Sequence, residues 1–170
     1  MTYKVAITKS CYDNSLADLK KCIDLIGGIE KYVKQNEKIL IKPNFLRAGK
    51  IEDAVTTHPE IIKSLCITVK EAGGIPIIGD SPGKGTVDKL INSIGLTEFF
   101  KKNNIKIVDC YTPVTKRKQI RGREIKFTLF KGIEESDKIF SAAKLKTHGQ
   151  MFFTGAVKNL FGLVPGALKP

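Results

Sequence analysis

The chain has 170 residues, of which 42% are hydrophobic, and a formal net charge of +12 at pH 7. This length and composition suffice for one domain with a buried core and argue against intrinsic disorder. No apolar run approaches the ~20 residues of a membrane-spanning helix, and the first residues alternate too regularly for a signal peptide. We therefore expect a cytoplasmic protein with no membrane partner.

The four cysteines, Cys11, Cys22, Cys66 and Cys110, show no metal-ligand spacing. In a cytosolic chain they would stay reduced. We expect most of them to be small core residues and no metal ligand in this chain. Cys11 is the exception that could face a site, because it follows the first predicted strand.

Strands and helices alternate along the first half of the chain. Residues 3–8 alternate apolar and polar side chains and predict a first strand. Ser15 is the predicted N-cap of a helix with one apolar stripe. Residues 37–42 predict a second strand. Thr57 has the capping-box spacing for a helix that ends near Glu71.

The next segments continue this alternation. Residues 75–79 form a wholly apolar run, typical of a strand in a sheet covered on both faces. Helices are predicted near 86–93 and 97–102, and a strand at 105–109. The pattern predicts an α/β fold with an open, mainly parallel, Rossmann-like sheet flanked by helices.

A basic β-hairpin insertion is predicted near residues 114–130. Two β-like runs flank Arg121-Gly122-Arg123. Between Thr115 and Lys131 the chain carries a surplus of cations, with Glu124 as the lone anion in that segment. A basic ribbon of this kind suits nucleic acid, an anionic substrate or an acidic protein, and it is equally typical of a solvated hairpin.

A strand at 138–142 precedes the stretch with the most chemistry. Lys144, Lys146 and His148 follow at alternate positions. A short helix is then predicted, with Thr154 as N-cap and Gly162 just past its end. Cations and a histidine beside the positive end of a helix suit a carboxylate or phosphate.

In an open parallel sheet, ligands bind outside the carboxyl ends of the strands. Polar side chains of several segments fall there, and we predict that His148 and Lys146 are catalytic. The predicted ligand-binding residues are Lys42, Asn44, Thr57, His58, Asp80, Ser81, Lys144, Lys158 and Asn159. Each could instead serve as a cap or turn former. The stretch Gly79–Thr86 resembles a phosphate loop but lacks its spacing.

Five motifs together carry a family resemblance: Lys42-Pro-Asn44, Thr57-His-Pro59, Gly79-Asp-Ser-Pro82, Lys144-x-Lys-x-His148 and Thr154–Gly162. In order, they resemble those of the family catalogued as domain of unknown function 362. The resemblance implies a shared pocket built from these Lys, Asn, His and Asp positions. It also implies a ferredoxin-like module with 4Fe–4S clusters outside this chain, because no Cys-x-x-Cys-x-x-Cys run is present. The family is also distantly similar to the N-terminal domain of lactate-racemase-like proteins.

Three functions remain open at this stage. The first is a ligand- or cofactor-binding domain of an iron–sulfur-associated redox protein, which binds an anionic small molecule. The second is nucleic-acid binding through the ribbon at 116–131, and the third is docking of an acidic protein or ferredoxin-like module there. We expect residues 1–170 to form a single α/β domain, the N-terminal part of a longer chain. Whether the whole protein is an enzyme, such as an oxidoreductase or isomerase, stays open.

Overall fold

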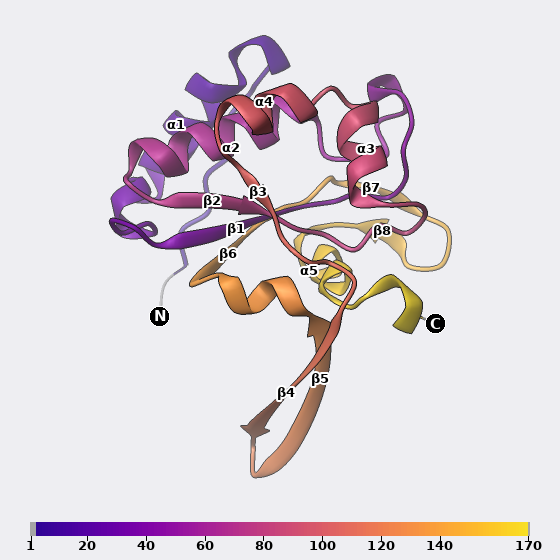
Figure 1. Ribbon diagram of the computed structural model, residues 1–170. Coiled ribbons are helices and arrows are strands. Elements are labelled where there is room, and N and C mark those ends of the chain that lie inside the picture. Colours follow the sequence, from indigo (N-terminus) through magenta and orange to yellow (C-terminus); the bar gives the residue numbers. More distant parts are fainter. Residues whose placement is uncertain (1–2, 170) are drawn as a thin grey trace.

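The computed structural model describes residues 3–169 and is organised around a four-stranded parallel sheet (Figure 1). Its strands are β1 (Lys38–Pro43), β2 (Ile75–Ile78), β3 (Lys106–Ile107) and β6 (Lys138–Ala142). They lie in the order β3-β2-β1-β6, and each neighbouring pair is parallel. The predicted α/β class and mainly parallel sheet are confirmed.

Helices cover one side of this sheet. They are α1 (Ser15–Leu25), α2 (Pro59–Glu71), α3 (Val87–Ser93) and α4 (Thr97–Lys102), and a 3-10 turn at Lys131–Glu135 lies on the other side (Figure 1). Because both faces of the sheet are covered, the middle of the central strand β1 is apolar. Ile39, Leu40 and Ile41 of β1 are each completely buried. Within the described residues, no helix is long and apolar enough to cross a membrane.

The strand order places a topological switch point at one end of the sheet, and we call the region outside the carboxyl ends of β1 and β6 the crevice. From β1 the chain crosses through α2 to β2 on one side, whereas β6 pairs with the opposite side of β1. The connections therefore diverge between β1 and β6. In open α/β sheets, ligands bind at such a switch point, outside the carboxyl ends of the strands.

The predicted first strand is wrong. Residues 3–8 adopt no regular secondary structure and pair with no strand in the part of the chain that the structure describes. The side chains of Tyr3, Val5 and Ile7 are 85–88% exposed. Alternation favours an extended backbone, but a strand also needs a neighbour to complete its hydrogen-bond ladder.

Two predicted helix caps are each displaced by one residue. Asn14 is the N-cap of α1, and Ser15 is instead buried, with its hydroxyl 2.8 Å from that of Ser64. His58 is the N-cap of α2, where its side chain accepts a hydrogen bond from the Glu60 amide. Thr57 is thereby free for a different contact, described below.

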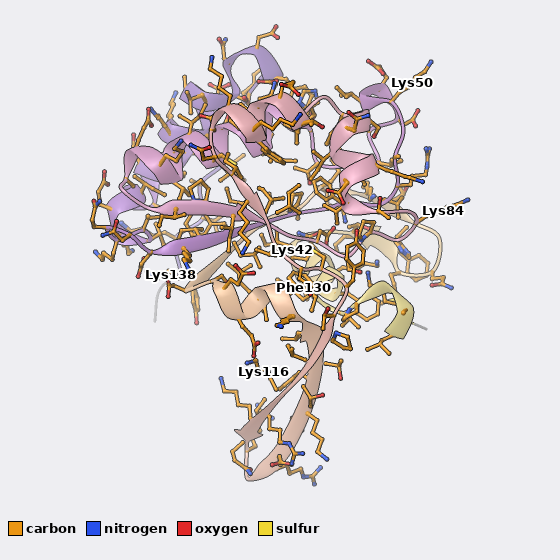
Figure 2. All side chains as sticks on the ribbon, in the orientation of Figure 1. Lys42, Lys50, Lys84, Lys116, Phe130 and Lys138 are labelled. Atoms are coloured by element: carbon orange, nitrogen blue, oxygen red, sulfur yellow. The ribbon has the colours of Figure 1, made fainter. Side chains whose placement is uncertain are left out.

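The basic hairpin is confirmed. Strands β4 (Pro113–Ile120) and β5 (Arg123–Phe130) form a separate antiparallel sheet that projects from the body of the protein (Figure 1). Phe130, at its base, is completely buried and anchors it to the core (Figure 2). Most other residues of the hairpin are exposed. We call residues 113–130 the arm.

The segment after β6 differs from the prediction. Residues Lys146–His148 form strand β7, which pairs with β8 (Phe152–Thr154). Thr154 therefore ends a strand, and Gly155 is the N-cap of α5 (Ala156–Asn159), a single turn that continues as a 3-10 turn at Leu160–Leu163. So short a helix has only a small dipole, and the expected attraction of an anion to its N-terminus loses most of its force.

The cysteines confirm the core expectation only in part. Cys66 and Cys110 are buried, Cys22 is partly exposed and Cys11 is exposed. All four are free thiols. Burial raises the pKa of both Cys66 and Cys110 to about 12, so these two thiols are unreactive at neutral pH.

Candidate functional site

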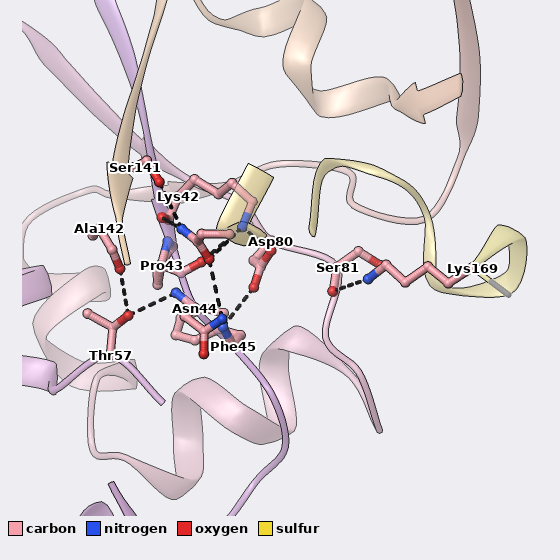
Figure 3. Close-up of polar contacts among 11 residues, drawn as sticks. Lys42, Pro43, Asn44, Phe45, Thr57, Asp80, Ser81, Ser141, Ala142 and Lys169 are labelled. Atoms are coloured by element: carbon pink, nitrogen blue, oxygen red, sulfur yellow. Dashed lines mark hydrogen bonds and ion pairs between the residues drawn. The ribbon is translucent and has the colours of Figure 1, made fainter. Parts of the chain in front are cut away.

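Thr57 joins the two strands that border the switch-point crevice. Its hydroxyl donates to the carbonyl of Ala142, at the end of β6, over 2.6 Å. The same oxygen accepts from the backbone amide of Asn44, just beyond β1, over 2.8 Å (Figure 3). Thr57 is 3% exposed. This bridge fixes the separation of the two carboxyl ends.

A buried ion pair lies beneath the crevice. Lys42 projects from the end of β1, and its Nζ lies 2.6 Å from Oδ1 of Asp80, which follows β2 (Figure 3). Lys42 is 0% exposed and Asp80 is 2% exposed. The other carboxylate oxygen of Asp80 accepts from the backbone amide of Phe45 over 2.7 Å. A ligand in solution therefore cannot reach either charge directly in this conformation.

Asn159 of α5 ties this pair to the C-terminal segment. Its Oδ1 accepts from Nζ of Lys42 over 3.1 Å, and its Nδ2 donates to the Lys42 carbonyl and the Ser141 hydroxyl. Gly162 then closes over the charges. A Cβ at this position would lie 2.1 Å from Oδ1 of Asp80 and 2.6 Å from Nζ of Lys42. Only glycine allows the chain to pass so close.

Burial opposes the charge of both partners. It raises the pKa of Asp80 from 3.8 to about 6, although the positive charge of Lys42 works in the other direction. It also lowers the pKa of Lys42, and here the charge of Asp80 opposes the shift. At pH 7 the carboxylate is still ionised, and the two charges depend on one another.

A group of lysines lies at the surface above the pair. Lys144 follows β6, Lys146 begins β7, Lys158 belongs to α5 and Lys169 is near the end of the described chain. All four are partly buried. Lys146 donates to the Val55 carbonyl, and Lys169 donates to the Ser81 carbonyl over 2.6 Å. We call these four side chains the lysine cluster.

The lysine cluster carries positive charge that no ion pair balances. Burial lowers the pKa of Lys146, and the nearby charges of Lys158 and Lys144 lower it further, whereas the charge of Asp80 acts weakly in the other direction. Burial also lowers the pKa of Lys169; the charge of Asp80 opposes this shift, and the charges of Lys42 and Lys158 add to it. No member of the cluster forms an ion pair with any residue between 3 and 169. Asp80, which is already paired with Lys42, is thus the one carboxylate whose charge lowers the electrostatic repulsion at Lys146 and Lys169 among the described residues.

His58 borders the cluster through an aromatic contact. Its ring stacks on Tyr12 with centroids 3.5 Å apart, and the Tyr12 hydroxyl lies 3.3 Å from Nζ of Lys144. Burial lowers the pKa of His58; the charge of Glu60 opposes this shift, and the charges of Lys144 and Lys63 add to it. His58 is therefore a neutral ring at pH 7, with Nδ1 already used as the cap acceptor.

His148 occupies a different position. It ends β7 at the tip of the β7–β8 hairpin, where its Nδ1 accepts from the amides of Gln150 and Met151 over 3.2 and 3.1 Å. These bonds place the ring proton on Nε2. Within residues 3–169, the side chain of His148 forms no hydrogen bond with the rest of the candidate site.

The cavity nearest to the crevice is small. It measures about 10 Å³ and is lined by Arg47, Lys50, Thr57 and His58, among others. A volume of that size holds about one water molecule. A ligand would therefore bind on the surface of the lysine cluster, unless the segment around Gly162 moves.

The structure thus divides the predicted residues into three groups. The first group belongs to the buried network or borders it: Lys42, Asp80, Asn159, Asn44, Thr57 and Ser81. The second group lies at the surface of the crevice: Lys144, Lys146, Lys158 and His58. His148 lies apart from both groups. Lys169, Tyr12 and Gly162 also contribute to the site and were not among the predicted site residues. For Gly162, the one signal in the sequence was a glycine between the apolar residues of the last motif, which allows the chain to pass close to Lys42 and Asp80.

The residues present do not fit an iron–sulfur cluster. The four cysteines come from separate parts of the fold, and two of them are buried in the core. Between residues 3 and 169, no group of three or more His, Cys, Asp or Glu side chains could hold a metal ion. The described residues therefore offer no set of ligands for an iron–sulfur cluster.

Comparisons with known proteins identify the family of this chain. The family model described as Domain of unknown function (DUF362) matches residues 39–170. The thylakoid-associated protein sll1697 of Synechocystis sp. is 32% identical over 154 residues, which cover 91% of this chain and 47% of that protein. The chain thus spans about half the length of this curated relative, and no solved structure matches it. The matched segment contains β1, the buried ion pair and the lysine cluster, and the chain belongs to the DUF362 family of domains of unknown function.

Proposed function

We propose that this domain binds an anionic small molecule or cofactor over the crevice between β1 and β6. One observation carries the proposal: the lysine cluster brings several positive charges without an ion pair to the switch point of a parallel sheet. Partly buried like charges raise the free energy of the site, and a bound carboxylate or phosphate would relieve it. Lys144, Lys146 and Lys158 are the proposed contacts.

The buried network would support the ligand site from below. Lys42, itself paired with Asp80, binds Asn159, which fixes α5 and with it Lys158. Asn44 adds a polar group at the base of the crevice, because its Oδ1 is buried and accepts no hydrogen bond from any described residue. A ligand that combines an anionic group with a hydrogen-bond donor would satisfy both features.

Chemistry at this site is a further part of the proposal. Lys146 has a lowered pKa and could release a proton more readily than an ordinary lysine. His148 would act through Nε2, the nitrogen left free by the turn, once the β7–β8 hairpin brings it toward a ligand. For the whole protein, an iron–sulfur-associated redox role remains a proposal that concerns parts outside this chain. A cytoplasmic location also remains a prediction.

Calorimetric titration with inorganic phosphate and with citrate tests the binding proposal. The variant K146A/K158A should bind at least tenfold more weakly, since charge-assisted hydrogen bonds contribute about 1.5–3 kcal/mol each. The control K89A/K102A removes the same amount of charge from two exposed positions, Lys89 on α3 and Lys102 on α4. Equal losses in both variants would mean that general electrostatic attraction, and no defined site, explains the binding.

A further inference from the structure

The arm has two different faces. In an antiparallel ribbon, residues paired across the strands lie on the same face. Lys116 pairs with Phe127, Lys118 with Ile125 and Ile120 with Arg123, so these side chains share one face. The other face carries the pairs Arg117–Lys126, Gln119–Glu124 and Thr115–Thr128. One face is thus amphipathic, and the other is polar beyond its base, where Pro113 pairs with the buried Phe130.

The amphipathic face is sorted into two rows. Its β5 row is apolar beyond Arg123, with Ile125 and Phe127 37–38% exposed, and Ile120 at the end of β4 is 41% exposed. Its β4 row carries two cations, Lys116 and Lys118, between Val114 and Ile120. Lys116 forms an ion pair with Glu134 of the body, whereas Lys118 and Arg123 have no ion-pair partner within the described residues.

This surface favours a protein partner over nucleic acid. A polyanion would neutralise cations on both faces and leave the apolar row in water. A sheet face with an apolar row is normally covered by a helix or another sheet, and a two-stranded ribbon alone is only marginally stable. A second copy of the arm would bring like charges together. The complementary element has an apolar stripe for the β5 row and acidic residues for the β4 row.

We propose that the amphipathic face of the arm docks an acidic, amphipathic helix of a protein partner. Leucine-sized side chains of that helix cover Ile125 and Phe127. Its carboxylates pair with Lys118 and Arg123. The arm is then a recognition element that projects from the domain, separate from the lysine cluster at the sheet edge.

The test uses the 170-residue chain and a synthetic helix as probe. The probe is a peptide of about 18 residues, long enough to form a helix, with leucines on one stripe and glutamates beside it. Binding is measured by fluorescence anisotropy. The variant F127S should weaken binding about tenfold or more, because the buried apolar contact is lost.

A face-matched pair of variants separates docking from general attraction. K118Q/R123Q and R117Q/K126Q each remove two positive charges from the same arm, but from opposite faces. The proposal predicts a roughly three- to tenfold loss of peptide affinity for the first pair alone. Equal losses, or no binding by the wild-type chain, would overturn it. Tighter binding to a DNA duplex than to the peptide would also overturn it, in favour of a nucleic-acid surface.

Discussion

Replacing Lys42 by methionine isolates the energetics of the buried ion pair. Methionine fills a similar volume but leaves the carboxylate of Asp80 buried without its counter-charge, which lies 2.6 Å away in the native protein. Breaking a buried pair by removing one partner costs about 3–5 kcal/mol. For a domain of this size, that loss lowers Tm by roughly 6–20 °C. Thermal and urea unfolding followed by circular dichroism measure it directly.

The cost of this substitution should depend on pH. The pKa of Asp80 is already raised from 3.8 to about 6, and removing the positive charge of Lys42 raises it further. A carboxyl whose folded pKa is raised contributes stability that is present below pH 3.8 and is lost as pH rises through the folded pKa. The free energy of unfolding of the K42M variant therefore continues to fall as pH rises above 6. In the wild type the ionisation of Asp80 causes no further loss in that range. The gap between them should widen by up to about 1.4 kcal/mol per pH unit.

A double-mutant cycle completes this test. In K42M/D80N the amide oxygen still accepts from the Phe45 amide, but no buried charge remains. The double variant should be more stable than K42M alone at pH 8, with a coupling of about 1–3 kcal/mol. If K42M costs less than about 1 kcal/mol, or if the two substitutions are additive, the pair is not the coupled unit described above.

Three further substitutions test the packing around the site by urea unfolding. G162A should lower the free energy of unfolding by about 1–3 kcal/mol, because its Cβ would meet Asp80 and Lys42. The control G149A has open space around its Cβ and should be tolerated. Equal effects of the two variants would contradict the close approach of Gly162 to the ion pair. T57V should lower the free energy of unfolding by about 1–3 kcal/mol, because it leaves the Ala142 carbonyl and the Asn44 amide without their shared partner. T57S keeps the hydroxyl and should restore stability if the bridge is the cause. F152G should leave stability unchanged or raise it by up to about 1 kcal/mol, because Phe152 has φ +62° and is 88% exposed; a large loss would show that its ring makes an essential contact.

Local patterns predicted much of the fold. The strand at 138–142 and the arm were located correctly, since apolar runs and a turn dipeptide determine such elements over short distances. Residues 3–8 show the limit of this reasoning. Their alternation indicates a strand, but no local signal reveals whether a neighbouring strand is available to pair with it.

The candidate site shows the same limit. The residues at the carboxyl edge could be named from the sequence because the ends of parallel strands meet there. The burial of these residues could not be predicted, because the partners that accompany Lys42 into the interior, Asp80 and Asn159, are distant in sequence. Charged residues are seldom fully buried unless they are paired, and the pairing depends on the tertiary fold. The lysine cluster likewise depends on Lys169, which no motif includes.

The ionisation of Lys146 tests the central claim most directly. Its pKa can be followed by NMR of the side-chain carbon next to the amine, with and without inorganic phosphate. We predict a pKa below 10.5 in the free protein, a rise when Lys158 is replaced by alanine, and a rise when phosphate is added. An ordinary pKa that responds to neither change would contradict the claim that lysines without an ion pair form an anion site at the switch point.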